Sequence, residues 1–255
     1  MEANQTFTVT HKKLLWIRHL LKNAALKVLN KFISKNDTQM KIALIGATGF
    51  VGGVVLKEAI ERGHEVTAIV RNPQKLSPQK NLVVEKGDVL DSDTLSQSLK
   101  GHDLLISTYN AGWTNPDLYN DFLNGSKSIQ EAVKKSGVKR YIVIGGAGSL
   151  FAAPNVQIVD TPEFPAAWKP GALAARDYLN ILRKDDELEW TFVSPALEMH
   201  PGTPRERRGT YRTGSDSPVF DANHKSTISV DDLAVAILDE AENPKHIKQR
   251  FTVGY

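Results

Sequence analysis

Short apolar runs alternate with segments of helical spacing from residue 41 to the end of the chain. The apolar runs predict strands at residues 41–45, 65–70, 82–85, 104–107, 140–144, 191–194 and 250–253. The segments between them predict helices at residues 50–61, 91–99, 117–136, 172–183 and 230–242. Because strands that alternate with helices form a parallel sheet covered on both faces, we expect an α/β fold with a doubly wound, mostly parallel sheet.

Two long irregular stretches interrupt this alternation in the C-terminal half, at residues 152–170 and 198–225. Loops of this length are uncommon in a compact domain and often build a binding site. We therefore expect a small C-terminal lobe, built from loops, that receives a substrate.

The first 39 residues differ from the rest of the chain. They carry seven basic and two acidic residues, a net charge of +5, whereas the remainder has 25 basic and 27 acidic residues. The pI of 8.9 therefore comes from this segment, and the rest has no basic surplus that would indicate nucleic-acid binding. We expect a basic amphipathic extension at residues 1–39 and a single nucleotide-binding domain at residues 40–255.

Residues 11–34 have the spacing of an amphipathic helix, for which three interpretations stay open. The helix could lie on an anionic membrane, it could pack on the domain or a partner, or it could result from translation at an upstream start. We favour the third, because Met40 directly precedes the first predicted strand.

The amino-acid composition excludes several kinds of functional site. The chain has no cysteine, which excludes disulfides, thiolate metal ligands and a cysteine nucleophile. Its seven histidines form no metal-binding motif, so we expect no metal site. No apolar stretch is long enough for a transmembrane helix and no secretory signal is present, so we expect a cytoplasmic protein.

A glycine-rich segment joins the first predicted strand to the first helix: Gly46-Ala47-Thr48-Gly49-Phe50-Val51-Gly52. Glycines here allow a sharp turn, close approach of the backbone to a pyrophosphate, and tight packing of the helix on the strand. The helix N-terminus then presents unpaired N–H groups to the phosphates. The context of strand, loop and helix indicates a dinucleotide-binding loop of the Rossmann fold, whereas the absence of Lys-Ser/Thr after the glycines excludes a P-loop.

The second strand predicts which nicotinamide cofactor binds. It ends at Arg71, where an acidic residue would hold the ribose of NAD, and an arginine near this position can pair with the 2′-phosphate of NADP. We therefore expect NADP(H) in preference to NAD(H), with Arg71 as a plain surface charge the alternative. Asp88, after the third strand, could accept a hydrogen bond from adenine or cap a short turn.

The chain resembles the atypical short-chain dehydrogenase/reductase superfamily through KIALIGATGFVG, the strand end at Arg71, GDVLD and VIGGAGSL. The strings VIGGAGSL, VDTPEFP, EWTF and QRFTVGY resemble more closely the bacterial NAD(P)H-binding proteins described as NADH-flavin reductases. This resemblance spans residues 40–255. It implies that the cofactor is contacted by Gly46, Thr48, Gly49, Phe50, Val51, Arg71 and Asp88, with Ser107 and Thr108 under the nicotinamide ribose and residues 145–149 beside the nicotinamide.

One departure from the superfamily pattern bears on the reaction. Typical members carry Tyr-x-x-x-Lys, a phenol that exchanges a proton and a lysine that lowers its pKa. Here Tyr178 is followed at the lysine spacing by Leu182. Hydride transfer to a flavin does not need that pair, because the flavin ring itself accepts the hydride when it is stacked on the nicotinamide. The protein needs only to provide a flat apolar slot for the ring.

Several residues are candidates for that slot and for its chemistry. Ser149 and Tyr109 are the candidate catalytic residues, although Ser149 could equally be a turn or cap serine. His200 follows a strand end and could donate a proton near neutral pH, or could be an exposed loop histidine. The run from Arg205 to Arg208 is interpreted as a solvated loop. The residues expected to line the substrate pocket are Trp113, Phe151, Trp168, Pro195 and His200.

Three functions follow, in order of preference. The first is an NADP(H)-dependent oxidoreductase that passes hydride to a flavin or a similar flat small-molecule acceptor. The second is a non-catalytic NADP(H) sensor that changes partners on cofactor binding. The third is a sugar-nucleotide epimerase or dehydratase, which the missing tyrosine–lysine pair disfavours. The sequence leaves the oligomeric state open.

Overall fold

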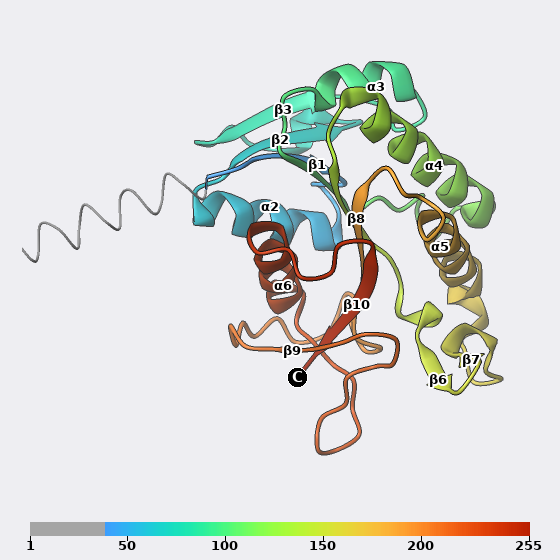
Figure 1. Ribbon diagram of the computed structural model, residues 1–255. Helices are drawn as coiled ribbons and strands as arrows, with labels where there is room; N and C mark the ends of the chain where they lie inside the picture. Colours follow the sequence, from blue (N-terminus) through green and yellow to red (C-terminus); the bar gives the residue numbers. More distant parts are fainter. Residues whose placement is uncertain (1–38) are drawn as a thin grey trace, which may run out of the picture. The chain divides into compact units, whose positions relative to one another are not determined.

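In the computed structural model, which describes residues 39–255, an eight-stranded sheet lies between two layers of helices (Figure 1). The predicted extension at residues 1–39 falls almost wholly outside the described residues. The strand order is β3-β2-β1-β4-β5-β8-β10-β9, with every neighbouring pair parallel except β9 and β10. The strands are β1 (Lys41–Ile45), β2 (Glu65–Val70), β3 (Leu82–Lys86), β4 (Leu104–Ser107), β5 (Arg140–Ile144), β8 (Glu189–Ser194), β9 (Arg212–Gly214) and β10 (Gln249–Gly254). The expected doubly wound Rossmann sheet is confirmed.

The helices divide between the two faces of the sheet. Helices α2 and α6 pack together on one face, and α3, α4 and α5 cover the other. Their bounds are α2 (Phe50–Arg62), α3 (Ser92–Leu99), α4 (Leu118–Ser136), α5 (Lys169–Leu182) and α6 (Val230–Glu242). The 3-10 turns are η1 (Pro73–Lys75), η2 (Ala147–Ser149), η3 (Ile158–Asp160) and η4 (Ala166–Trp168).

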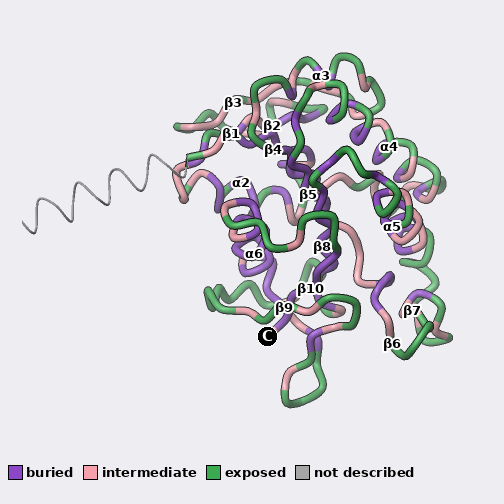
Figure 2. The backbone as a smooth tube through the Cα atoms, viewed as in Figure 1, coloured by how far each residue is buried: buried purple, intermediate pink, exposed green. Residues whose placement is uncertain are grey.

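The central strands are buried on both faces because each contributes alternate side chains to two cores (Figure 2). In β1, Ile42 and Leu44 join the core under α2 and α6, whereas Ala43 and Ile45 join the core under α3, α4 and α5. A shift of one residue would exchange these sets, so the pattern fixes the register.

The long loops contain more structure than the sequence predicted. The segment 152–170 includes most of a small hairpin of β6 (Phe151–Ala153) and β7 (Val156–Gln157), with Asn155 at a positive φ of 63°. The segment 198–225 includes β9, which pairs antiparallel with β10 at the sheet edge. Helix α5 begins at Lys169, three residues earlier than predicted, because Pro170 fits the first turn of a helix where no N–H bond is lost.

Candidate functional site

The predicted cofactor residues lie at the carboxyl ends of neighbouring strands. The glycine loop follows β1, Arg71 follows β2, Asp88 lies beyond β3 and Thr108 follows β4. The order of the strands reverses between β1 and β4, and in open α/β sheets ligands bind at such a switch point.

The glycine loop has the shape that a pyrophosphate needs. Gly46 has a φ of +85°, and a Cβ there would lie 2.8 Å from the carbonyl oxygen of Thr108. A Cβ at Gly52 would overlap the carbonyl oxygen of Gly46 and come within 2.6 Å of Thr108 Oγ1. The strand, the loop and the first turn of α2 therefore pack as closely as their backbones allow.

The N-terminus of α2 is suited to an anion. Its N-cap is Gly49, no side chain caps the first turn, and that turn has no acidic residue. The free N–H groups and the positive end of the helix dipole thus face the loop without competition. These features fit the pyrophosphate of a dinucleotide, which Gly46, Thr48, Gly49, Phe50, Val51 and Gly52 would hold.

Thr108 supports this loop from the next strand. Both its backbone N–H and its Oγ1 donate to the carbonyl oxygen of Ile45, at 3.0 and 2.9 Å. Ser107, one residue earlier, is buried at the end of β4 and accepts from the N–H of Tyr109 at 3.4 Å. Both residues therefore lie under the switch point, where the resemblance places the ribose.

Three of the predicted residues act on one another electrostatically. Burial raises the pKa of Tyr109, the carboxylates of Asp121 and Asp88 raise it further, and the guanidinium of Arg71 opposes them. Arg71 is exposed at the end of β2. Asp88 accepts from the backbone N–H of Leu90 at 3.0 Å, so the predicted turn role is present.

The two candidate catalytic hydroxyls are engaged with the protein itself. Tyr109 donates to the carbonyl oxygen of Asp121 at 3.0 Å, and its ring stacks on Phe122 of α4. Ser149 is 1 % exposed, donates to the carbonyl oxygen of Gly146 at 3.3 Å and accepts from Arg250. These contacts argue against a direct catalytic role for either hydroxyl and give Ser149 a structural one.

Tyr178 is also excluded as a replacement for the missing superfamily tyrosine. Its side chain is fully buried in the core under α5, and its hydroxyl lies 3.2 Å from that of Tyr141. Burial raises the pKa of both phenols. Neither can reach a substrate.

Two of the residues expected in the substrate pocket contact each other, and a third lies against the same end of α5. Trp168, in η4, contacts His200 with ring centroids 6.2 Å apart. Trp113 reaches the same end of α5, where its ring lies 3.0 Å from the position of a Cβ on Gly171. The indoles are exposed by 61 % and 48 % at Trp113 and Trp168, which is unusual for such large apolar groups. We call Trp113, Trp168 and His200 the aromatic slot.

The other two predicted pocket residues are more buried than the two indoles. Phe151 is half-buried in β6, with its N–H on the carbonyl oxygen of Asp216 at 2.8 Å. Pro195 is buried directly after β8, so in this conformation it presents little surface to a bound molecule.

Residues 145–149 form a fixed segment beside the slot, which we call the shelf. A Cβ on Gly145 would fall within the ring of Phe192, and one on Gly148 would lie 2.9 Å from the Cβ of Ala172 in α5. The shelf therefore rests on β8 below and on α5 at its side. The sequence predicted its place beside the nicotinamide but not these contacts.

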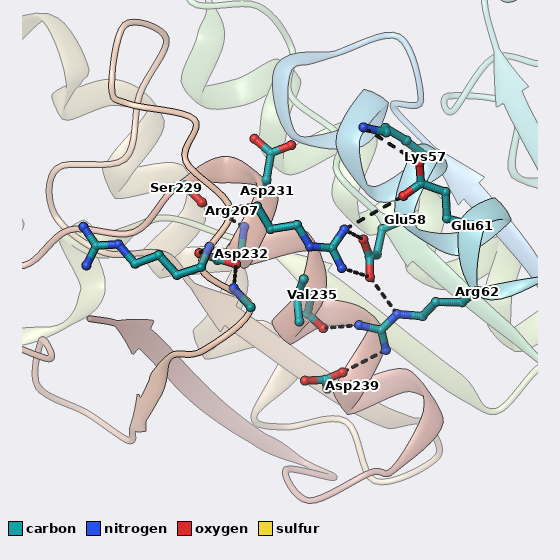
Figure 3. A network of polar contacts seen from close by, with 12 residues as sticks. Lys57, Glu58, Glu61, Arg62, Arg207, Ser229, Asp231, Asp232, Val235 and Asp239 are labelled. Atoms are coloured by element: carbon teal, nitrogen blue, oxygen red, sulfur yellow. Dashed lines mark hydrogen bonds and ion pairs between the residues drawn. The ribbon is translucent and has the colours of Figure 1, made fainter.

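The arginine-rich run of the C-terminal lobe is fastened to the helix pair α2–α6 (Figure 3). Arg207 donates to both carboxylate oxygens of Glu58, at 2.5 and 2.9 Å, and Glu58 also accepts from Arg62 at 2.8 Å. Asp232 accepts from the backbone N–H groups of Arg208 and Gly209. The run from Arg205 to Arg208 is exposed, as expected for a solvated loop, and the ion pair of Arg207 in addition attaches it to the helix that begins at the glycine loop.

Within residues 39–255, no helix is long and apolar enough to cross a membrane. The expectation of a cytoplasmic location stays a prediction.

Comparison with known proteins identifies the family. Residues 46–244 match the model of a family described as NAD(P)H-binding. The chain is 39 % identical over 216 residues to the uncharacterized protein YwnB of Bacillus subtilis. The aligned region covers 84 % of this chain and 98 % of YwnB.

Two solved structures are similar over nearly the whole domain. One, from Bacteroides thetaiotaomicron, is described as a "putative epimerase" and has 44 % identity and a TM-score of 0.78, covering 85 % of this chain and 97 % of that one. The other, from Streptococcus pneumoniae, is described as a "putative NADH-flavin reductase" and has 36 % identity and a TM-score of 0.73, covering 84 % and 99 %. The resemblance inferred from the sequence motifs is thus confirmed, and the chain belongs to the NAD(P)H-binding family of Rossmann-fold oxidoreductases.

Proposed function

We propose that this protein is an NADP(H)-dependent oxidoreductase that passes hydride to a flavin or a similar flat acceptor. The observation that carries the proposal is the aromatic slot: Trp113, which is largely exposed, lies against the start of α5, and Trp168, which is half-exposed, precedes that helix and contacts His200. Helix α5 has no tyrosine–lysine pair that could catalyse ketone–alcohol chemistry, because Tyr178 is buried and the residue four positions later, where the lysine would be, is Leu182. A flat acceptor that stacks on aromatic rings suits such a slot.

Each part of the chain would have a separate task. The bound cofactor would supply a hydride from its nicotinamide ring. The glycine loop and the N-terminus of α2 would hold the pyrophosphate, and Arg71 would pair with the 2′-phosphate. Asp88, Ser107, Thr108 and Gly145 would contact the rest of the cofactor, from the adenine to the nicotinamide.

His200 would transfer the proton that the acceptor takes up together with the hydride. A flavin reduced by one hydride also takes up one proton. The Nδ1 atom of His200 lies 3.0 Å from the carbonyl oxygen of Pro201, so the tautomer with a proton on Nδ1 fits this contact. Nε2 then remains as the nitrogen that exchanges a proton with solvent or acceptor.

The deciding experiment is NADPH oxidation with FMN, FAD and riboflavin as acceptors, comparing the wild type with Trp113→Ala. We expect turnover by the wild type, and a rise of about tenfold in the acceptor KM on removal of the indole, because an aromatic contact contributes about 1 kcal/mol or more beyond its buried area. The Kd for NADPH should stay within about threefold, since the phosphates dominate it.

Ile247→Ala, which removes another exposed apolar side chain just before β10, is the control and should change neither constant. If the wild type binds NADPH but oxidises it with none of these flavins, nor with quinones, the proposed reaction is wrong and a cofactor sensor takes its place.

The proposed preference for NADP(H) depends on Arg71. We expect Arg71→Ser to raise the Kd for NADPH by about 10- to 100-fold, because a charge-assisted pair with a phosphate is lost, and to change the Kd for NADH by less than about twofold. Fluorescence titration with both cofactors measures this. Lys100→Ser, which removes one remote exposed charge, is the matched control. Equal losses for NADPH and NADH would show that Arg71 does not read the 2′-phosphate.

A further inference from the structure

Arg250 is a buried cation in β10, which lies in the other half of the sheet from β1 and the glycine loop. Its side chain is 1 % exposed. Its Nη1 donates to the carbonyl oxygen of Ser149 at 2.8 Å and to Ser149 Oγ at 3.2 Å. Its Nε and Nη2 donate to the carboxylate of Asp216.

These contacts connect three segments that are far apart in the sequence. Ser149 is the last residue of the shelf, Asp216 belongs to the loop after β9, and Arg250 comes from the last strand. Asp216 also accepts, through its carbonyl oxygen, from the N–H of Phe151 just beyond the shelf. The planar fork of one guanidinium thus joins the shelf to the C-terminal lobe, which a lysine ammonium could not do in the same geometry.

A buried charge of this kind is a costly way to gain stability. Desolvation opposes it, and an apolar side chain of similar volume often serves stability as well or better. Two hydrogen bonds also hold the shelf. The N–H of Gly145 donates to the carbonyl oxygen of Val193 in β8 at 2.9 Å, and Gln157 Nε2 in the neighbouring hairpin donates to the carbonyl oxygen of Ser149 at 3.0 Å. Close packing of Gly145 on Phe192 and of Gly148 on Ala172 limits approach from below and from the side. Arg250 differs from these contacts because it donates to both the carbonyl oxygen and the hydroxyl of Ser149 and also binds Asp216, so it connects the end of the shelf to the sheet and to the loop after β9.

We propose that Arg250 is a positioning residue, which holds the shelf at the place where the nicotinamide and the aromatic slot meet. This inference rests on the proposed hydride transfer. The side chain of Arg250 is buried among protein groups and would touch neither cofactor nor acceptor. It acts through Ser149 and Asp216, and its effect is therefore on the geometry of transfer and not on the binding of the phosphates.

The test compares Arg250→Met and Arg250→Lys with Arg183→Met. Arg183 also lies near Asp216, at 3.8 Å, but its side chain is 42 % exposed, which makes it a matched control. We expect both Arg250 variants to lower kcat for NADPH oxidation by about 10- to 100-fold, because a displacement near 1 Å has effects of this size, with the Kd for NADPH within about threefold of wild type. Arg183→Met should keep both constants within about twofold.

A second readout does not depend on turnover. The emission of the bound nicotinamide reports how firmly that ring is held, so it should shift or fall in Arg250→Met and stay unchanged in Arg183→Met. If Arg250→Met does not fold, Asp216→Asn, at a half-exposed position, removes the partner charge and should lower kcat by about 3- to 10-fold.

The outcomes separate the two proposals. Absence of turnover in the wild type, with altered emission in Arg250→Met, overturns the hydride-transfer proposal and keeps the positioning role. Unchanged kcat and emission in a folded Arg250→Met, or a rise in the NADPH Kd that parallels the fall in kcat, overturns the positioning role.

Discussion

Substitution of Gly52 by alanine should weaken NADPH binding by at least about 100-fold, the equivalent of nearly 3 kcal/mol. The added Cβ would overlap the carbonyl oxygen of Gly46 and lie 2.6 Å from the Gly46 carbonyl carbon and from Thr108 Oγ1. Neither the loop backbone nor the threonine is free to move, because Thr108 is bonded twice to Ile45. The helix must therefore separate from the strand, which displaces the N–H groups that face the phosphates. Isothermal titration with NADPH measures the loss.

The neighbouring glycine provides a matched control. A Cβ on Gly53 would lie 3.6 Å from the carbonyl oxygen of Ala47, an ordinary contact, and Gly53 is exposed inside the same helix. Gly53→Ala should leave the Kd for NADPH unchanged and stabilise the protein by about 0.5–1 kcal/mol, as expected when alanine replaces glycine in a helix interior. Similar NADPH affinities for Gly52→Ala and Gly53→Ala would show that close packing of the loop does not create the phosphate site.

The sequence was sufficient for the features that depend on local chain geometry. The alternation of Ile42 and Leu44 with Ala43 and Ile45 predicted a strand buried on both faces, and the glycine spacing predicted the turn into α2. Such patterns follow from the periods of strands and helices and from the steric limits of the backbone. The helix predicted at residues 91–99 is present as Ser92–Leu99 for the same reason, with Asp91 as its N-cap, whose side chain accepts from the N–H of Thr94.

The features that the sequence did not predict depend on contacts between distant segments. Strand β9 is a three-residue edge strand, too short to show a period, and it exists only because β10 offers an open edge. Ser149 was a plausible catalytic hydroxyl until Arg250, about a hundred positions later, was found to bind it. One signal was available: Arg250 lies within a predicted buried strand, and a charge in such a place requires a buried partner.

The two halves of the sheet have different requirements, which explains this contrast. The strands β1 to β3 would hold the cofactor, whose phosphates backbone groups can recognise, so a local motif is enough. In the proposed reaction, the strands β5, β8 and β10 would bring an acceptor to the nicotinamide, and the contacts that would do this join distant segments, Trp168 with His200 and Asp216 with Arg250. Long-range side-chain contacts of this kind vary without changing the fold, which is why fold and cofactor are easier to infer than the acceptor.

Glu240→Ala should be the most destabilising of the single substitutions considered, by about 3–5 kcal/mol at pH 7. Glu240 is 4 % exposed near the end of α6 and accepts from Arg140 at 2.8 Å, from His246 Nδ1 at 2.7 Å and from two backbone N–H groups. Arg140 is also buried, and its other acceptors are backbone carbonyls and Thr191. The alanine variant therefore leaves a buried guanidinium without its carboxylate.

The pH dependence of this loss has a definite sign. Burial alone would raise the pKa of Glu240, but the hydrogen bonds from His246 and Lys245 outweigh it and hold that pKa below its usual value. The folded protein thus binds this proton less readily than the unfolded chain. The stabilisation by Glu240 is complete above the ordinary glutamate pKa, about 4.3, and disappears as the pH falls through the lower folded value. Urea unfolding at pH 7 and in acid should show the difference between wild type and Glu240→Ala shrinking as the pH falls.

The same helix supplies the control for this prediction. Glu242 is more exposed than Glu240, and its partner Arg62 keeps the carboxylates of Glu58 and Asp239. Its other partner, the buried His64, loses the contact at Nε2 but keeps the N–H of Met40 on Nδ1. Glu242→Ala should therefore lower the free energy of unfolding by about 1–2 kcal/mol, less than Glu240→Ala. Arg140 is the first residue of β5 and so lies at the amino ends of the parallel strands, whereas the glycine loop lies at their carboxyl ends. Glu240→Ala protein that remains folded should therefore bind NADPH normally. A decrease in the free energy of unfolding below about 1 kcal/mol in Glu240→Ala would mean that Arg140 contacts solvent or another anion when Glu240 is removed. A loss of NADPH affinity would mean that the amino and carboxyl ends of the strands are energetically coupled.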